Sequence, residues 1–439
     1  MTRKKTNLSV FGLGKLGAPM LAVFAEKGFN VIGCDTSEET VNQINSGAVS
    51  IQETGLHSLL NKNLSKISAT TDFNEAISNS DASFIIVPTP SNDDDFFDNS
   101  FVLNCVKNIG KALKEKTGYH LVVVTSTVMP GSMEAEIKPT LEEFSGKTIG
   151  KNLGLCYNPE FIALGTVIED MLNPDILLIG ESDEKAGLQL EAILCSTYNT
   201  KPVIHRMNFE EAELSKIAIN SFVTTKISYA NMLANMCEKV GNASIDKVSA
   251  ALGDDSRIGH KYLRGGVAFG GPCFPRDNKA FVALGNQLGV KTNLAFATDQ
   301  INEFQTQRLS AFVLEHVETS KLIGIFGCSY KPNTPVTEES PGLKLMEDLS
   351  NLGYRGLITD EQATHAGNEN FIFETDLRKA VKTSDCIILM TTEKKYSEIN
   401  LVIQEIDAGL KKIIIDPWRM LNKEIQPLNV TLITPGDSS

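Results

Sequence analysis

The 439-residue sequence is 42% hydrophobic and 22% charged, which is ordinary for a globular protein, and its length favours about three domains. The formal net charge of −13 argues against binding to nucleic acid or to an anionic membrane surface, because such partners require clustered Lys and Arg. No apolar run approaches the roughly 18 residues of a membrane helix. The 8 cysteines are scattered without CxxC spacing. These features predict a cytoplasmic protein with reduced thiols, without a metal site or a disulfide framework.

The first segment, residues 1–200, alternates short β-rich runs with helical ones. Examples are "NLSVFGLG", "APMLAVFAEKGF" and "NVIGCD". Such alternation is typical of βαβ units, in which helices cover both faces of a parallel sheet. We therefore expect a Rossmann-like, dinucleotide-binding domain in this segment.

The second segment, residues 201–315, shows a helical pattern throughout. It begins with one helix of about 30 residues, longer than a compact domain needs, so we expect this helix to bridge two domains and to pack against its copy in a homodimer or higher oligomer. An internal core helix is the alternative. The apolar positions that recur at three- and four-residue spacing are Leu214, Ile217, Ala218, Phe222, Ile227, Ala230, Leu233, Ala234 and Cys237.

The third segment, residues 316–439, returns to alternation in "KLIGIFGCSYKP", "YRGLITD" and "DCIILMTT". It predicts a second, smaller Rossmann-like unit. The expected fold class is thus α/β, with two Rossmann-like parallel-sheet domains joined by a helical domain that contains a long central helix.

A glycine turn follows the first predicted strand. In "VFGLGKLG", Gly12, Gly14 and Gly17 stand in GxGxxG order and open a helix, and the next strand ends at Asp35. The glycines let backbone N–H groups approach a pyrophosphate at the positive helix end, while Asp35 can accept hydrogen bonds from ribose hydroxyls. A carboxylate repels a 2′-phosphate, so we predict NAD rather than NADP; a tight turn without a ligand is the alternative. The predicted cofactor contacts here are Gly12, Leu13, Gly14, Lys15, Leu16, Gly17 and Asp35.

A cysteine lies between two prolines in "AFGGPCFPRDN", residues 268–278. Glycine and proline predict a rigid loop rather than a core segment, so Cys273 is a poor packing residue. Arg276 is a nearby cation that favours the thiolate form, and Asp277 adds a carboxylate that can handle protons. A reactive thiol beside a dinucleotide cofactor suggests oxidation of an aldehyde through a thioester; an inert cysteine is the alternative.

These residues carry a family resemblance. Over essentially its whole length the sequence resembles the UDP-glucose and GDP-mannose dehydrogenases, the four-electron sugar-nucleotide 6-dehydrogenases. "FGGPCFPRD" resembles the catalytic loop of that family, and "AELSKIAIN" matches its E-x-x-K-x-x-x-N helix. "NPEF", "STVMPG", "SRIGHKYL" and "GCSYKPNTP" also occur in family order. The resemblance implies an NAD-dependent oxidoreductase that acts on a nucleotide sugar.

Lys216 and Asn220 are four residues apart, so both project from one helix face and can hold an oxygen or a water between them. A solvated Lys216 paired with Glu213 is the alternative. With the resemblance, Lys216 and Asp277 are candidates for positioning the water or base that takes the substrate hydroxyl proton. Lys216 and Asn220 would then stabilise negative charge on the substrate oxygen.

The thiol of Cys273 would attack the aldehyde, and oxidation of the resulting thiohemiacetal by a second NAD would give a thioester. Water aided by Glu160 would release the carboxylate. The resemblance implies Thr127 as a partner of this water and of the nicotinamide; a helix N-cap is the alternative for Thr127. We also expect Arg276 to contact the cofactor.

The resemblance further implies where the nucleotide sugar binds. Arg257 would reach the substrate from a second subunit, and Arg257 and Lys331 are suitable diphosphate partners, although each is alternatively a surface cation. Gly270 and Gly271 would allow close approach of the sugar, and Pro272 and Pro275 would hold the loop. The predicted substrate contacts are Glu160, Phe161, Lys216, Asn220, Arg257, Tyr262, Gly270, Phe274 and Lys331.

Four positions depart from the usual family pattern. Leu164 replaces a glutamate after "NPEF", and Glu338 stands where an arginine is usual before "ES". An anion in place of a cation near a cofactor pyrophosphate should weaken binding unless another residue compensates. Pro272 and Arg276 stand where a small residue and a lysine are more usual. These departures leave the identity of the sugar open.

The leading hypothesis is NAD-dependent oxidation of UDP-glucose at carbon 6 to the uronic acid. The same chemistry on a UDP-N-acetylhexosamine or on GDP-mannose is the first alternative. A non-catalytic, nucleotide-sugar-binding oligomer is an alternative of another class, although it has no need to keep Cys273, Lys216, Asn220 and Asp277 together. A two-domain hydroxyacid dehydrogenase would lack the third segment and the thiol loop.

Overall fold

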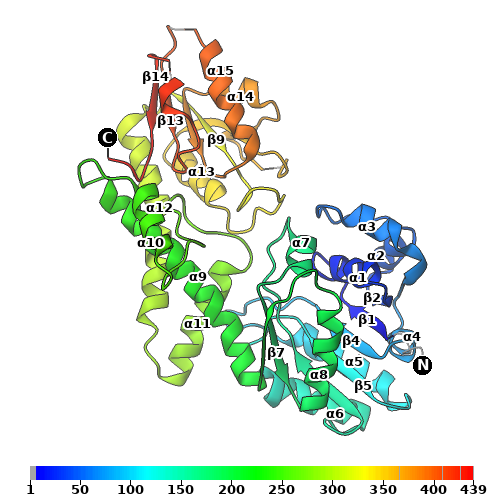
Figure 1. Cartoon of the computed structure of the whole chain (residues 1–439). Coiled ribbons are helices and arrows are strands. Elements are labelled where there is room, and N and C mark those ends of the chain that lie inside the picture. Colours follow the sequence, from blue (N-terminus) through cyan, green and yellow to red (C-terminus); the bar gives the residue numbers. More distant parts are fainter. Residues whose placement is uncertain (1–5, 365, 408, 426, 439) are drawn as a thin grey trace. The chain divides into compact units, whose positions relative to one another are not determined.

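The computed structural model describes residues 6–364, 366–407, 409–425 and 427–438. They fold into two compact units, Met1–Ala218 and Ile219–Ser439, each containing a Rossmann-like sheet (Figure 1). The boundary falls inside the long helix α9 (Phe209–Cys237). The α/β fold with two such sheets and a helical central region is confirmed. The finer division at residues 1–200, 201–315 and 316–439 stays a prediction.

Unit 1 contains a sheet of order β3-β2-β1-β4-β5-β6-β7-β8. Neighbouring strands pair in parallel except β6 and β7, which are antiparallel. In a parallel sheet covered on both faces the central strands are apolar throughout, and β5, "HLVVV", is buried along its whole length. Within the described residues its strands are β1 (Asn7–Phe11), β2 (Asn30–Cys34), β3 (Ile67–Thr70), β4 (Ala82–Ile85), β5 (His120–Val124), β6 (Leu153–Tyr157), β7 (Ile176–Glu181) and β8 (Val203–Met207).

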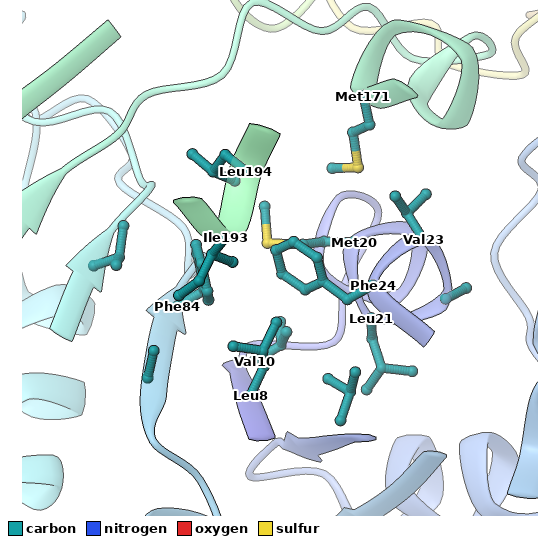
Figure 2. Packing of buried hydrophobic residues seen from close by; sticks show 14 of the residues in the cluster. Leu8, Val10, Met20, Leu21, Val23, Phe24, Phe84, Met171, Ile193 and Leu194 are labelled. Atoms are coloured by element: carbon teal, nitrogen blue, oxygen red, sulfur yellow. The ribbon is translucent and has the colours of Figure 1, made fainter. Parts of the chain in front are cut away.

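Helices pack on both faces of this sheet. Alternate residues of β1 point to opposite faces, so Leu8 and Val10 join one core while Phe11 joins the other. Figure 2 shows the first core, where Phe24 lies close to Phe84. Ahead of α9, the helices described are α1 (Gly17–Glu26), α2 (Glu38–Asn45), α3 (Leu56–Lys62), α4 (Phe73–Ser78), α5 (Ser100–Lys114), α6 (Lys138–Ser145), α7 (Val167–Leu172) and α8 (Glu184–Cys195), with a π-helix η2 (Met133–Ile137) before α6.

Helix α9 buries a polar stripe. The stripe recurs at three- and four-residue spacing and comprises Glu213, Lys216, Asn220, Thr224, Ser228 and Asn231. Leu214 and Phe222, which the apolar spacing had placed on the packed face, are instead 45% and 64% exposed. The expectation of an apolar packed face is wrong at these two positions, because the inward positions around them are taken by hydrogen-bonding side chains.

Unit 2 contains the remainder of α9, three further long helices and the second sheet. Its strand order, β11-β10-β9-β12-β13-β14, repeats the order of the first six strands of unit 1, and all its pairs are parallel. Leu309 and Val313 of α12 join Leu345 and Leu349 of α13 in a core on one face of this sheet. The helices in the described part are α10 (Ile245–Asp254), α11 (Phe274–Leu288), α12 (Asn293–His316), α13 (Pro341–Asn351), α14 (Leu377–Thr383) and α15 (Ile399–Val402). The strands there are β9 (Leu322–Phe326), β10 (Arg355–Thr359), β11 (Phe371–Phe373), β12 (Cys386–Leu389), β13 (Lys412–Ile415) and β14 (Val430–Ile433).

Candidate active site

The glycine turn between β1 and α1 has the shape of a dinucleotide cradle. Gly12 has a φ of +91°, and a Cβ there would lie 2.5 Å from the Ile86 carbonyl oxygen. A Cβ on Gly17 would overlap the carbonyl oxygen of Gly12, whereas one on Gly14 would point into open space. The turn is therefore closed on the protein side and open at Gly14, next to the positive end of α1. This shape fits a bound pyrophosphate.

Asp35 follows β2 at the same edge of the sheet. Its carboxylate accepts hydrogen bonds from the backbone N–H groups of Leu13, at 2.7 Å, and Ser37, at 2.9 Å. A carboxylate accepts about four hydrogen bonds, so Asp35 keeps capacity for ribose hydroxyls. The side chain of Leu13 is buried. Lys15 and Gly14 are exposed, and Leu16 is half-buried.

Lys216 of α9 lies against the loop that follows β6. Its Nζ donates to the Glu160 carbonyl oxygen at 2.7 Å and sits 4.6 Å from the centre of the Phe161 ring. Lys216 is buried, at 6% exposure, so these contacts replace part of the hydration of its ammonium. Burial raises the pKa of the Glu160 carboxyl to about 7, and the charge of Lys216 opposes this rise. Lys216, Glu160 and Phe161 are thus in mutual contact.

Glu213 is fully buried one turn before Lys216. Its carboxylate accepts hydrogen bonds from the N–H groups of Gly131, at 2.7 Å, and Met133, at 2.8 Å, where η2 begins. Burial raises the pKa of this carboxyl to about 7, although the two N–H groups oppose the rise. Glu213 therefore anchors the loop that follows β5.

Thr127 lies in that same loop. Its carbonyl oxygen accepts a hydrogen bond from the Thr89 hydroxyl at 2.8 Å. Ser126 next to it exchanges two hydrogen bonds with the backbone of Val87. The loops after β4 and β5 are thereby tied together. The N-cap of η2 is Ser132, not Thr127.

Cys273 is the N-cap residue of α11 and is exposed, whereas six of the eight cysteines, all of which are described, are buried. The positive end of a helix favours the thiolate form. Asp277, one turn into α11, is fully buried. It accepts from Arg276 Nη2 at 2.9 Å and from Asn220 Nδ2 at 2.6 Å. Cys273, Arg276, Asp277 and Asn220 therefore lie close together.

One of the two prolines expected in the thiol loop lies in a helix. Pro275 lies in the first turn of α11 rather than in a loop; a proline is tolerated there because the first helical N–H groups lack partners within the helix. The loop therefore ends at Cys273. Pro272 precedes the N-cap, and nothing in the structure explains why a proline stands there.

Three aromatic rings surround the start of α11. Phe274 makes edge-on contacts with Tyr262, with ring centres 6.2 Å apart, and with Phe269, at 6.4 Å. Tyr262 is half exposed and has a φ of +65°. Arg257 projects into solvent and pairs with Asp255 at 2.6 Å.

A second glycine turn follows β9 and carries Lys331, whose Nζ lies 5.9 Å from the centre of the Tyr330 ring. The Asp360 carboxylate, after β10, accepts hydrogen bonds from five donors: the N–H groups of Cys328, Ser329, Gln362 and Ala363 and the Ser329 hydroxyl. Burial opposes ionisation of Asp360, but the hydrogen bonds outweigh it and lower the pKa of this carboxyl. Asp360 therefore fixes the start of the loop that holds Lys331.

One of the unusual positions, Leu164, has a structural explanation. Leu164 packs against the core that contains β1 and α1, so an apolar side chain suits that place. Glu338 is exposed, and its carbonyl oxygen accepts a hydrogen bond from the Gly271 N–H at 3.1 Å.

Neither a metal cluster nor a membrane span is found where the structure can be described. Across these residues no group of three His, Cys, Asp or Glu side chains could hold a metal ion. The helices of the same ranges are all too short or too polar to cross a bilayer.

Family models match the chain in three consecutive regions. Residues 6–199 match the NAD binding domain of the UDP-glucose/GDP-mannose dehydrogenase family, residues 210–304 its central domain, and residues 324–423 its UDP binding domain. The chain belongs to the UDP-glucose/GDP-mannose dehydrogenase family. The resemblance noted in the sequence and the expected NAD cofactor are thereby confirmed.

Relatives of this dehydrogenase include enzymes named for different sugars. It is 33% identical over 423 residues to the UDP-glucose 6-dehydrogenase AglM of Haloferax volcanii, covering 95% of this chain and 97% of the relative. It is 32% identical over 446 residues to the GDP-mannose 6-dehydrogenase of Pseudomonas putida, covering 98% and 99%. A solved UDP-glucose dehydrogenase from Pyrobaculum islandicum has a TM-score of 0.88 and 28% identity, covering 100% and 99% of the two chains.

Sequence reasoning missed three residues that shape the site of this dehydrogenase: Glu213, Asp360 and Tyr330. Glu213 was considered only as a partner of Lys216. Asp360 ends a predicted strand in "YRGLITD", just as Asp35 does in "VIGCD", and this parallel could have identified it. Tyr330, in "GCSYKP", gives no signal of its own. Its ring lies against Gly271, which is nearly sixty residues earlier in the chain.

Proposed function

We propose that this dehydrogenase oxidises UDP-glucose at carbon 6 to UDP-glucuronate in two successive two-electron steps. UDP-glucose, two NAD⁺ and one water give UDP-glucuronate, two NADH and three protons. The observation that carries the proposal is the exposed Cys273 at the N-terminus of α11, next to a buried Asp277 held by Asn220 and Arg276. A single oxidation to an aldehyde has no need of such a thiol.

The turn from Gly12 to Gly17 and the Asp35 carboxylate would hold NAD, with Thr127 and Arg276 as further contacts. NAD, when bound, accepts the hydrides that the oxidation of carbon 6 releases. The open side of Gly14 supports this assignment, since it leaves space next to the positive helix end, where a pyrophosphate binds favourably.

In the first oxidation the carbon 6 hydroxyl loses its proton to a base or water positioned by Lys216 and Asp277. Lys216 and Asn220 are one turn apart on a continuous helix, and both carry hydrogen-bond donors, so they can stabilise the alkoxide that develops on that oxygen. The buried position of Lys216 strengthens this interaction, because charges interact more strongly away from water.

In the second oxidation the Cys273 thiolate adds to the aldehyde carbon, and the carbonyl oxygen takes a proton to give a thiohemiacetal. Loss of that proton and of the carbon 6 hydride leaves a thioester. Water then adds to the thioester carbonyl, the carbon–sulfur bond breaks, and the thiolate returns to its starting state.

Glu160 would take the proton from the attacking water. A general base works best when its pKa lies near the operating pH, and burial raises the pKa of Glu160 to about 7. The neighbouring charge of Lys216 keeps part of the Glu160 population ionised at neutral pH. Thr127 would orient the same water.

Lys331, Arg257, Tyr262, Phe274, Gly270 and Phe161 would contact the nucleotide sugar. The match of residues 324–423 to a UDP binding domain supports a uridine nucleotide. GDP-mannose is the second candidate, and the 32% identity to the GDP-mannose 6-dehydrogenase of Pseudomonas putida favours it. A UDP-N-acetylhexosamine is a further alternative, because Leu164 packs in a core where the family usually has a glutamate.

The test is a panel of UDP-glucose, GDP-mannose and UDP-N-acetylhexosamines, each followed for NADH and for uronate. We expect two NADH per uronate and the highest kcat/KM with UDP-glucose. One NADH per sugar with free aldehyde as the end product would overturn the proposed chemistry, whereas a preference for another sugar would overturn only the substrate. Binding without turnover of any sugar would favour the non-catalytic alternative.

We further infer that the protein is a homodimer or higher oligomer that works in the cytoplasm. Phe222, Tyr229, Met232 and Met236 are between 36% and 64% exposed and lie on one face of α9, which supports packing against a second copy. A second copy could also supply Arg257. Light scattering tests this: a mass of one chain at micromolar concentration would overturn it, and Phe222→Glu should shift an oligomer towards monomer.

A further inference from the structure

The thiol loop, residues 268–273, packs against the loop that follows β9, residues 328–340. The Gly271 N–H donates to the Glu338 carbonyl oxygen at 3.1 Å. Both loops belong to unit 2. The segment two residues before Cys273 is therefore bonded to the loop that carries Lys331.

The two glycines of "GGPC" are required by this contact. A Cβ on Gly270 would overlap the carbonyl oxygen of Glu339. Gly271 has a φ of +88°, and a Cβ there would overlap the Tyr330 ring, with Cε2 only 2.6 Å away. The Tyr330 ring thus lies directly on the backbone of Gly271, at a distance that only glycine permits.

The other side of the thiol loop is held independently. Asn302 of α12 exchanges two hydrogen bonds with the backbone of Phe269, at 2.7 and 3.0 Å. After Cys273 the chain enters α11, where the Asp277 N–H donates to the Cys273 carbonyl oxygen at 2.8 Å. Between these fixed ends, Tyr330 and Glu338 supply the contacts to Gly271.

The loop after β9 is itself rigidly supported. Asp360 fixes its first residues through five hydrogen bonds. The Asn333 N–H donates to the buried Glu393 carboxylate at 2.9 Å, and the Tyr330 N–H donates to the Val336 carbonyl oxygen at 3.0 Å. A ring mounted on such a loop can define the position of what it touches.

We propose that Tyr330 is a positioning residue for the second oxidation: its ring, together with the Glu338 carbonyl, holds Gly271 so that Cys273 reaches the aldehyde. The proposal rests on the thiol chemistry proposed above. Because Tyr330 precedes Lys331, one loop both contacts the nucleotide and sets the position of the thiol. The first oxidation, which does not use the thiol, depends less on this contact.

The experiment compares the wild type, Tyr330→Ala and Tyr330→Phe with UDP-glucose in the presence of hydroxylamine, which traps free aldehyde as the oxime. Misplacing a reacting group by about 1 Å costs about 10²-fold, so Tyr330→Ala should slow uronate formation by about 10- to 100-fold. NADH formation in the first step should stay within about threefold, because neither Lys216 nor Asn220 is disturbed. Oxime should accumulate, and NADH per uronate should rise above two.

Tyr330→Phe keeps the ring and should restore the wild-type partition between oxime and uronate. A general loss of structure would lower the rates of both oxidations together and leave the ratio of oxime to uronate unchanged. A change in this ratio therefore distinguishes a positioning role from unfolding. If Tyr330→Ala does not fold, Tyr330→Leu should give an intermediate partition. Tyr330→Ala or Tyr330→Leu with the wild-type partition would overturn the proposal while leaving the proposed function intact.

A second readout needs no substrate. In a Cys195→Ser background, Cys273 is the cysteine that remains exposed, and its alkylation by iodoacetamide can be followed by mass spectrometry. Without the Tyr330 ring the thiol should move away from the positive end of α11, so alkylation at pH 7 should slow by about threefold or more. At about pH 10, where thiols are ionised in any case, the rates should agree. Equal rates at pH 7 would overturn the proposal even if no sugar is oxidised.

Discussion

The glycine turn after β1 and the glycine turn after β9 begin and end in the same way. The Gly12 N–H donates to the Cys34 carbonyl oxygen at 2.8 Å, and the Gly327 N–H donates to that of Thr359 at 2.8 Å. In each turn a later glycine opens the helix: side chains at Gly17 or Gly342 would overlap the carbonyl oxygen of the first glycine. The six-strand order around each turn is also the same.

The acidic residue after the second strand is used differently in the two turns. Asp35 accepts two backbone N–H groups and can accept ribose hydroxyls, whereas Asp360 already accepts five donors. Residues 13–16 separate Gly12 from Gly17 in the first turn, and the longer segment 328–341 separates Gly327 from Gly342 in the second. Asp360 thus organises a longer loop instead of a ligand. The same fold serves a cofactor in one unit and, as proposed, substrate and thiol in the other.

The largest effect expected is from Asp360→Ala. Removal of this carboxylate leaves several buried N–H groups without a partner, and the free energy of unfolding should fall by about 3 kcal/mol or more. Thermal unfolding and NAD titration check this. NAD affinity should not change, since Asp360 belongs to the second turn. Loss of NAD binding in a folded variant would contradict the assignment of NAD to the first turn alone.

Next come Gly17→Ala and Gly342→Ala, a matched pair. Each added methyl meets a carbonyl oxygen, so each variant should lose about 1–3 kcal/mol of unfolding free energy. Only Gly17→Ala should also weaken NAD binding, because only the first turn is assigned to NAD. Equal losses of NAD affinity in calorimetric titrations would show that the turns do not differ in function.

Asp35→Ala should act mainly on the cofactor. Loss of charge-assisted hydrogen bonds to ribose should weaken NAD binding by about 10- to 100-fold, with a stability loss below about 1.5 kcal/mol. Fluorescence titration with NAD and with NADP measures both affinities. Wild-type NAD affinity in Asp35→Ala would remove this carboxylate from the cofactor site.

Carboxyl groups of the two units also differ in titration. The pKa of Glu160 is raised by burial to about 7, so kcat should fall about tenfold per pH unit below that value as the base is protonated. Glu160→Gln should be slower by about 10²-fold or more and lack this acid limb. A Gln variant with the wild-type pH profile would assign the limb to another group.

The folded-state pKa of Asp360 is lowered, so its contribution to stability is present above its unfolded pKa of about 3.9 and is lost as the pH falls further. The stability difference between wild type and Asp360→Asn should therefore persist at neutral pH and shrink in acid. Denaturant unfolding at several pH values measures it, and a difference that grows in acid would contradict the assigned shift.

Local sequence patterns predicted the features that depend on neighbouring residues. The GxGxxG turn with Asp35, the long helix and the Lys216–Asn220 spacing all follow from short-range periodicity. The contact of Asn220 with Asp277 was not predicted, because fifty-seven positions separate the two residues and no local pattern joins them.

Features that depend on packing between distant segments could not be predicted in this way. Phe222 fits an apolar helix face by spacing, yet it is exposed because the inward face of α9 is polar. Gly271 is predicted to leave room for a ligand, and the sequence gives no sign that the Tyr330 ring lies against it. Composition does not reveal which side of a glycine is occupied.

The most direct measurement is mass spectrometry of acid-quenched Glu160→Gln enzyme during turnover of UDP-glucose. If Cys273 forms the thioester and Glu160 activates the water, the sugar nucleotide should accumulate covalently on the peptide that contains Cys273, up to one per chain, while uronate appears about 10²-fold more slowly. Uronate formation with Cys273 unmodified, and at the wild-type rate in Cys273→Ser, would contradict a covalent role for this thiol.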